Sequence, residues 1–274
     1  MQLLDLFADR SQSGDTTNLT IPADWNSWQG RHGGLIAGLA ADVAAATWPG
    51  AAVKAITAHF GRQSDDGAFA FTAVTRRAGR VVRLVDVTVA QGDAEVLTAT
   101  VTLAAEPPEE AVQWFAAQPP ASLPPERCQN FEFDRRFLPV GAHLDIRPCG
   151  GAFPLTGAAH PWMLAWVGVV PEVVIGPGAA VLLCDLAPGV YPMLAAPVAG
   201  PTVEMTVHLC AELGSAPGSG PALASQRNSA TSKNWSVDDT SLWDSGGRLI
   251  AQARQVRRIV GGIASGIVDG NPAA

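Results

Sequence analysis

The feature that most constrains this 274-residue sequence is an internal repeat. The segment Thr-Ala-His-Phe that begins at Thr57 recurs roughly 150 residues later as Thr-Val-His-Leu from Thr206. The turn and strand that begin at Gly92 recur at nearly the same separation from Ser245, and the apolar, Gly- and Ala-rich segment 33–48 has a counterpart over 178–196. Three features repeated in the same order predict a chain made of two similar units.

A proline-rich segment separates the two copies. Three pairs of adjacent prolines begin at Pro107, Pro119 and Pro124. Adjacent prolines cannot lie in a helix interior or a central strand, so this segment is predicted to be a connector. We therefore predict an N-terminal repeat over residues 1–105, a connector over 106–130 and a C-terminal repeat over 131–268, each repeat being of domain size.

Each copy shows the same order of expected elements, an apolar segment of helical length followed by four alternating, β-branched strands. The helical segments carry almost no charge, and a helix that is apolar on most sides must be enclosed by other elements. The pattern predicts an α+β fold, the double hot-dog, in which a long antiparallel sheet wraps around a central helix twice over; an unspecified pair of α+β domains is the alternative. The expected strands are 52–62, 68–76, 81–91 and 95–103, then 202–211, 222–228, 235–243 and 248–260.

Composition and motifs limit the classes of partner. A net charge of −7 lacks the basic surface that a nucleic-acid-binding protein needs. The first ten residues are interrupted by charges, unlike a signal peptide, and the longest apolar run is broken by charges and prolines, unlike a membrane span. The sequence contains no G-x-S-x-G, no Walker A segment, no Cys-x-x-Cys and no metal-binding histidine spacing. We therefore expect a cytoplasmic protein without metal, cofactor, nucleic acid or membrane as partner.

A small polar set remains in the second copy. Asp185 interrupts an apolar stretch on the segment assigned to the central helix, where burial would raise its pKa and suit a general base; alternatively it caps a helix that restarts at Ala187. Gln255 falls on the more apolar face of its strand, where a buried amide needs partners, unless this is a solvated strand end. Strand alternation places Thr202 on the outer face, which favours a structural role.

The repeat provides an internal control for this polar set. When the copies are aligned, the first copy offers apolar or small residues at the corresponding positions, so it lacks both the acid and the amide. A single site in the second copy is the prediction that follows. The first-copy counterparts of Asp185, Thr202 and Gln255 are a position near Ile36, Val53 and Thr102.

The blocks LLCDLAPGVYPML, GPTVEMTVHL and SLWDSGGRLIAQARQVRR, with GRHGGLIAGLAADVAA in the first copy, resemble the corresponding blocks of the double hot-dog acyl-CoA thioesterase family. The resemblance extends from Trp28 to Arg258. Members of that family use an Asp, a Thr or Ser and a Gln to hold and activate a water that attacks the thioester. The resemblance assigns these roles to Asp185, Thr202 and Gln255. It implies hydrolysis of acyl-CoA to free acid and CoA, with no covalent intermediate.

Residues at the start of the first helical segment are candidates for the remaining functions. The backbone amides of Gly33 and Gly34 could bind the oxyanion or the substrate. His32 could contact the ligand too, although a local hydrogen bond at the helix start is the interpretation we favour. The chain departs from the family in having Gly-Arg-Gln after Phe60, where Arg-Pro is frequent, and in two prolines, at 188 and 192, within the second helical segment.

Two other functions stay open at this point. The first is a non-catalytic acyl-binding protein that shares the fold. The second is a hot-dog hydratase or dehydratase, which uses an Asp/His pair a few residues apart near a helix start; the second helical segment has no histidine, which argues against it. A homodimer or higher homo-oligomer, paired through exposed sheet edges, is also expected.

Overall fold

The structure is a computed structural model that describes residues 1–28, 30–64, 66–105, 112–136, 138–196, 198–211, 213 and 220–260. Residues 106–111 of the predicted connector and 261–268 of the predicted C-terminal repeat lie outside the described residues.

The described strands form a single twelve-stranded antiparallel sheet. All eight strands predicted from the sequence are present, with ends that differ by a few residues. Four further strands were not predicted; β7, for example, carries a proline and adjacent glycines, which weaken a strand pattern. The strands are β1 (Arg10–Ser13), β2 (Thr16–Thr20), β3 (Ala52–Phe60), β4 (Ala68–Ala78), β5 (Val82–Gln91), β6 (Ala94–Ala104), β7 (Leu144–Gly151), β8 (Trp162–Val169), β9 (Thr202–Leu209), β10 (Ala222–Ser232), β11 (Trp235–Trp243) and β12 (Leu249–Arg258).

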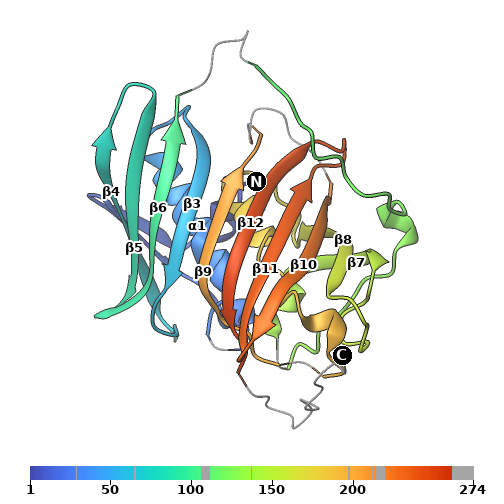
Figure 1. Cartoon of the computed structure of the whole chain (residues 1–274). Helices are drawn as coiled ribbons and strands as arrows, with labels where there is room; N and C mark the ends of the chain where they lie inside the picture. The colour runs from blue at the N-terminus through green and yellow to red at the C-terminus, as the bar shows by residue number, and fades with distance from the viewer. Residues whose placement is uncertain are drawn as a thin grey trace.

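The order of the strands is symmetric about the middle of the sheet, where β3 lies beside β9 (Figure 1). Along the sheet the order is β1-β2-β4-β5-β6-β3-β9-β12-β11-β10-β8-β7, so the second half repeats the first in reverse. Thr57 and Thr206, which are equivalent in the repeat, pair across the centre, and the Thr206 hydroxyl donates to Thr57 Oγ1 at 3.2 Å. An approximate two-fold axis therefore relates the halves, and the predicted double hot-dog fold is confirmed.

Two α-helices, α1 (Gly33–Ala46) and α2 (Pro177–Leu183), pack against each other under the sheet. Most of α1 is buried, as its uncharged sequence predicts. The backbones of the two helices are in contact at Gly38 and Gly178. A Cβ atom at Gly38 would overlap the carbonyl oxygen of Gly178. Short 3₁₀ segments complete the described secondary structure: Leu3–Leu6, Ala23–Trp25, Pro125–Arg127, Pro139–Ala142 and Tyr191–Met193.

The second helix is much shorter than the sequence analysis predicted. It ends at Leu183, and Asp185 lies just beyond it in a non-helical segment. Pro188 lacks an N–H, and its ring would clash with the Cys184 carbonyl in a continued helix, so the helix stops before it. Both expectations for Asp185, a place within the central helix and a cap for a helix restarting at Ala187, are therefore wrong.

Each helix start is capped by an aspartate from the other half. Asp185 Oδ2 accepts a hydrogen bond from the Gly34 N–H at 2.6 Å, and Asp42 Oδ1 accepts one from the Gly178 N–H at 2.9 Å. The alignment that placed Ile36 opposite Asp185 is thus corrected, because Asp42 occupies the two-fold-related position. The alignment failed because the segment between helix and next strand differs in length, 47–51 in one half and 184–201 in the other. No helix among the described residues is long and apolar enough to cross a membrane.

Candidate active site

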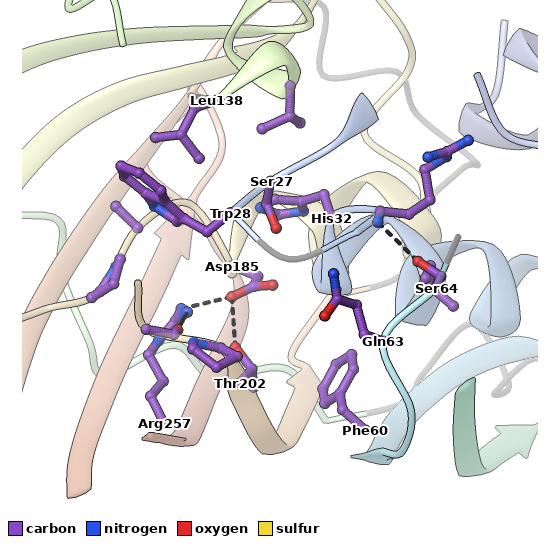
Figure 2. Close-up of a pocket in the computed structure, with 18 of the residues that line it drawn as sticks. Ser27, Trp28, His32, Phe60, Gln63, Ser64, Leu138, Asp185, Thr202 and Arg257 are labelled. Carbon is purple, nitrogen blue, oxygen red and sulfur yellow. Dashed lines mark hydrogen bonds and ion pairs between the residues drawn. The ribbon is translucent and has the colours of Figure 1, made fainter. Parts of the chain in front are cut away.

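A cavity of about 170 Å³ lies where the start of α1, the segment after α2, and the ends of β9 and β12 meet (Figure 2). Asp185, Thr202 and Arg257 form one polar wall of it. Most of the other lining side chains are apolar, and polar residues from segments 27–32 and 61–64 lie on the remaining side. The apolar lining includes Ile36, Phe60, Val96, Leu138, Val140, Leu144 and Leu186.

Asp185 lies at the centre of this wall, and only 3% of it is exposed. Its Oδ1 accepts hydrogen bonds from Thr202 Oγ1 at 3.3 Å and from Arg257 Nη2 at 2.6 Å, while its Oδ2 accepts from the Gly34 N–H. A Cβ at Gly34 would lie 2.5 Å from the Asp185 Cβ. Glycine at position 34 is therefore what allows the carboxylate to approach the helix start.

Thr202 faces the cavity because β9 contains a β-bulge. Val256 of β12 pairs with Glu204 and Arg257 pairs with Thr202, which leaves Val203 as an extra residue. A bulge reverses the alternation of side chains beyond it. Val203 is accordingly exposed and Thr202 points inward, so the interpretation from alternation, an outward Thr202, is wrong.

Gln255 lies on the inner face of β12 as predicted and is 1% exposed. Its Nε2 donates to the Cys184 carbonyl oxygen at 2.7 Å, and its Oε1 has no hydrogen-bond partner among the described residues. Gln255 is not among the described residues that line the cavity. The structure thus brings Asp185 and Thr202 together, whereas Gln255 holds the residue before Asp185.

Arg257 is a member of the site that the sequence analysis did not identify. Its side chain is 5% exposed, and besides Asp185 it contacts Asp238 (Nε to Oδ2, 3.1 Å) and donates to the Gly200 carbonyl at 3.3 Å. The signal was present, because Arg257 follows Gln255 on the same apolar face of the strand. An arginine on such a face indicates a buried ion pair, but in the sequence analysis Arg257 only supported the alternative of a solvated strand end.

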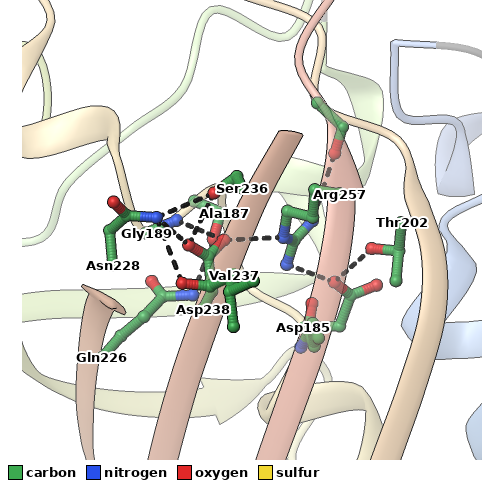
Figure 3. Close-up of polar contacts among 12 residues, drawn as sticks. Asp185, Ala187, Gly189, Thr202, Gln226, Asn228, Ser236, Val237, Asp238 and Arg257 are labelled. Atoms are coloured by element: carbon green, nitrogen blue, oxygen red, sulfur yellow. Dashed lines mark hydrogen bonds and ion pairs between the residues drawn. The ribbon is translucent and has the colours of Figure 1, made fainter. Parts of the chain in front are cut away.

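Asp238 on β11 is also buried and was not identified (Figure 3). Its Oδ2 accepts from the Gly189 N–H at 2.9 Å, and its Oδ1 accepts from Asn228 Nδ2 at 2.7 Å and from Ser236 Oγ at 2.8 Å. Gln226 Nε2 donates to the Ala187 carbonyl oxygen at 2.6 Å. These bonds tie the segment after α2 to β10 and β11 and so fix the backbone that carries Asp185.

His32 caps α1, which confirms the local hydrogen bond that the sequence favoured. Its Nδ1 accepts from the Leu35 N–H at 3.3 Å, and the ring also bonds to the backbone of Asp185. Burial lowers the pKa of His32, the Asp185 charge opposes this, and the Arg257 charge adds to it. The ring is therefore neutral at pH 7, and both of its sides are held by the backbone.

The helix-start amides differ in what they contact. The Gly34 N–H is occupied by Asp185, so it is not free to bind an oxyanion. Gly33 lines the cavity, and within the described residues its N–H has no hydrogen-bond partner. Among the described residues there is no group of three or more His, Cys, Asp or Glu side chains placed to hold a metal ion.

Two domain models of one protein family match this chain. Residues 21–104 match the family model of the acyl-CoA thioesterase N-terminal domain, and residues 116–259 match that of the acyl-CoA thioesterase C-terminal domain. A search of curated proteins finds no match.

Solved structures share the fold at low sequence identity. A conserved hot-dog protein of unknown function from Alicyclobacillus acidocaldarius is 22% identical, with a TM-score of 0.85, covering 96% of this chain and 100% of its own. A proposed thioesterase II from Thermobifida fusca is 24% identical, with a TM-score of 0.81 and coverages of 95% and 98%. The acyl-CoA thioesterase II TesB2 from Mycobacterium marinum is 16% identical, with a TM-score of 0.71 and coverages of 92% and 96%.

Proposed function

Because this chain belongs to the acyl-CoA thioesterase family, we propose that it hydrolyses acyl-CoA thioesters at the cavity beside Asp185, with a water molecule as the nucleophile. The observation that carries the proposal is the buried Asp185 carboxylate at the start of α1, hydrogen-bonded to Thr202 and facing an apolar-lined cavity. The apolar lining suits an acyl chain, and the polar residues on the other side suit the polar part of CoA.

Asp185 acts as the general base in this proposal. A carboxylate has about four lone-pair directions; Gly34, Thr202 and Arg257 occupy three, which leaves one on Oδ2 for a water proton. The Thr202 hydroxyl donates its own proton to Asp185, so its oxygen can accept the second hydrogen of that water and orient it. The water oxygen then attacks the thioester carbonyl. The CoA thiolate leaves and takes up the proton held by Asp185.

The oxyanion that forms during the attack needs a hydrogen-bond donor. We assign this role to the Gly33 N–H, which opens onto the cavity at the positive end of the α1 dipole. Gln255 has a supporting role, since its bond to the Cys184 carbonyl fixes the backbone next to Asp185. This replaces the water-holding role that the resemblance implied for Gln255.

The direct test is the release of free thiol from a panel of acyl-CoAs, from acetyl- to palmitoyl-CoA, with the purified full-length protein. We expect turnover that depends on the length of the acyl chain, because the apolar part of the cavity has a limited volume. Calorimetry on the same panel separates the alternative. Tight acyl-CoA binding without thiol release over hours would establish a non-catalytic acyl-binding protein and overturn the proposal.

Substitution Thr202→Val is expected to lower kcat by about 10-fold, because valine keeps the shape but removes both the bond to Asp185 and the acceptor for the water. Thr206→Val is the matched control on the same strand. Thr206 bonds to Thr57 and does not line the cavity among the described residues, so its loss should leave kcat within about twofold. Equal kcat values for both variants would refute the role given to Thr202.

The hydrogen bonds of His32 argue against the hydratase or dehydratase alternative. The fold does bring His32 close to Asp185, although the two are distant in sequence. A proton-transferring histidine needs a ring nitrogen free for the substrate, whereas this ring is bonded to the backbone at Leu35 and Asp185. The oligomeric state and the cytoplasmic location stay predictions from the sequence.

A further inference from the structure

We propose that Arg257, shared between Asp185 and Asp238, is a positioning residue that sets the orientation of the general base. This inference rests on the proposed function, since it concerns the same cavity and the same reaction. It adds a residue, and a second buried carboxylate behind it, to the machinery around Asp185.

The geometry of the cluster supports the positioning role. The guanidinium reaches Asp185 through Nη2, Asp238 through Nε and the Gly200 carbonyl through Nη1 (Figure 3). Gly200 lies two residues before Thr202, so one planar group connects the segments that carry the base and its hydroxyl partner. The guanidinium fork fixes direction as well as distance, which a lysine ammonium cannot do.

A second buried carboxylate holds the other side of the guanidinium. All three side chains of the cluster are almost completely buried. Asp238 accepts three further hydrogen bonds, from Gly189, Asn228 and Ser236, which fix it between β11 and the segment after α2. Arg257 is therefore anchored at Asp238 and holds Asp185 from that fixed point.

The test is the split between kcat and KM in two variants that disturb the cluster. Arg257→Gln removes the group that orients Asp185, so kcat should fall by about 10-fold or more while KM stays within about twofold. Asp238→Asn loosens the anchor of the guanidinium and should lower kcat in the same sense but less. A purely structural role would leave kcat near the wild-type value in variants that are folded.

Two further variants complete the design. Arg257→Lys keeps the charge but loses the fork, so kcat should stay reduced. Arg254→Met is the matched control, because Arg254 lies on the outer face of the same strand and pairs with Asp239. It should leave kcat and KM unchanged.

A second readout, acyl-CoA binding measured by calorimetry, does not depend on turnover. A lower kcat with unchanged binding in a folded Arg257→Gln variant supports the proposal. A kcat within about twofold of wild type in that variant, or equal losses of kcat and binding, would overturn it. A wild-type protein that binds acyl-CoA but releases no thiol would show that the proposed function, and with it the catalytic part of this inference, has failed.

Discussion

Substitution Asp185→Asn is expected to lower kcat for acyl-CoA hydrolysis by about 10²- to 10⁴-fold, the range that a positioned general base contributes. The asparagine amide oxygen can take the place of Oδ1 and still accept from Thr202 and Arg257, so the side chain stays near its place. It cannot take up a proton from water at neutral pH. Thiol release under saturating acyl-CoA measures kcat, and calorimetry on the same variant shows whether the substrate still binds.

Asp42→Asn is the matched control, because Asp42 is related to Asp185 by the two-fold axis and caps the other helix in the same way. It does not line the cavity among the described residues, so kcat should stay within about twofold of wild type. The unfolding midpoint of Asp185→Asn needs to be measured too, since a buried Arg257 loses one ionic partner. Equal losses of kcat in the two variants, both folded, would mean that Asp185 is only a helix cap.

Hydrophobic periodicity predicted most of the fold. The eight strands that follow the two helical segments alternate clearly, and their repetition at a nearly constant separation implied two related halves. The pattern also placed Gln255 on the buried face of its strand. These predictions hold because alternation reports which side of a strand faces the core, and the core is continuous across both halves.

The errors come from backbone irregularities that side-chain patterns do not reveal. The extra residue at Val203 reverses the facing of Thr202, and only the pairing partner shows that a bulge is present. Pro188 indicates that α2 ends early. The similarity of segment 178–196 to the first helical segment nevertheless favoured a helix of full length. Because α2 ends early, the segment after it is longer than the segment after α1. An alignment with one constant separation therefore missed the equivalence of Asp42 and Asp185.

Arg257 and Asp238 show a different kind of limit. A charged residue on a buried face becomes stable only through a partner, and their partners are brought together by the sheet and by the loop after α2. Sequence spacing cannot supply that information, although the arginine on an apolar face indicates that a partner exists.

The stability of the wild-type protein is expected to fall between pH 5 and pH 8 because of Asp42. Burial raises its pKa from 3.8 to about 7, the charge of Asp5 adds to this, and the amides of Gly178 and Leu4 oppose it. Since the folded pKa lies above the unfolded one, the folded state binds the extra proton between these values. The contribution is complete below pH 3.8 and is lost as pH rises through 7. At about 1.4 kcal/mol per unit of pKa, the loss between pH 5 and pH 8 is about 3 kcal/mol.

Urea unfolding of wild type and Asp42→Asn at pH 5 and pH 8 tests this expectation, because an asparagine has no proton to lose over this range. The difference in unfolding free energy between the two pH values should shrink by about 3 kcal/mol in Asp42→Asn. Asp93→Asn, in an exposed hairpin turn, serves as the control and should keep the wild-type difference. If Asp42→Asn retains the wild-type difference in full, Asp42 is ionised throughout in the folded protein. Asp42 would then cap α2 as a carboxylate rather than as a neutral acid.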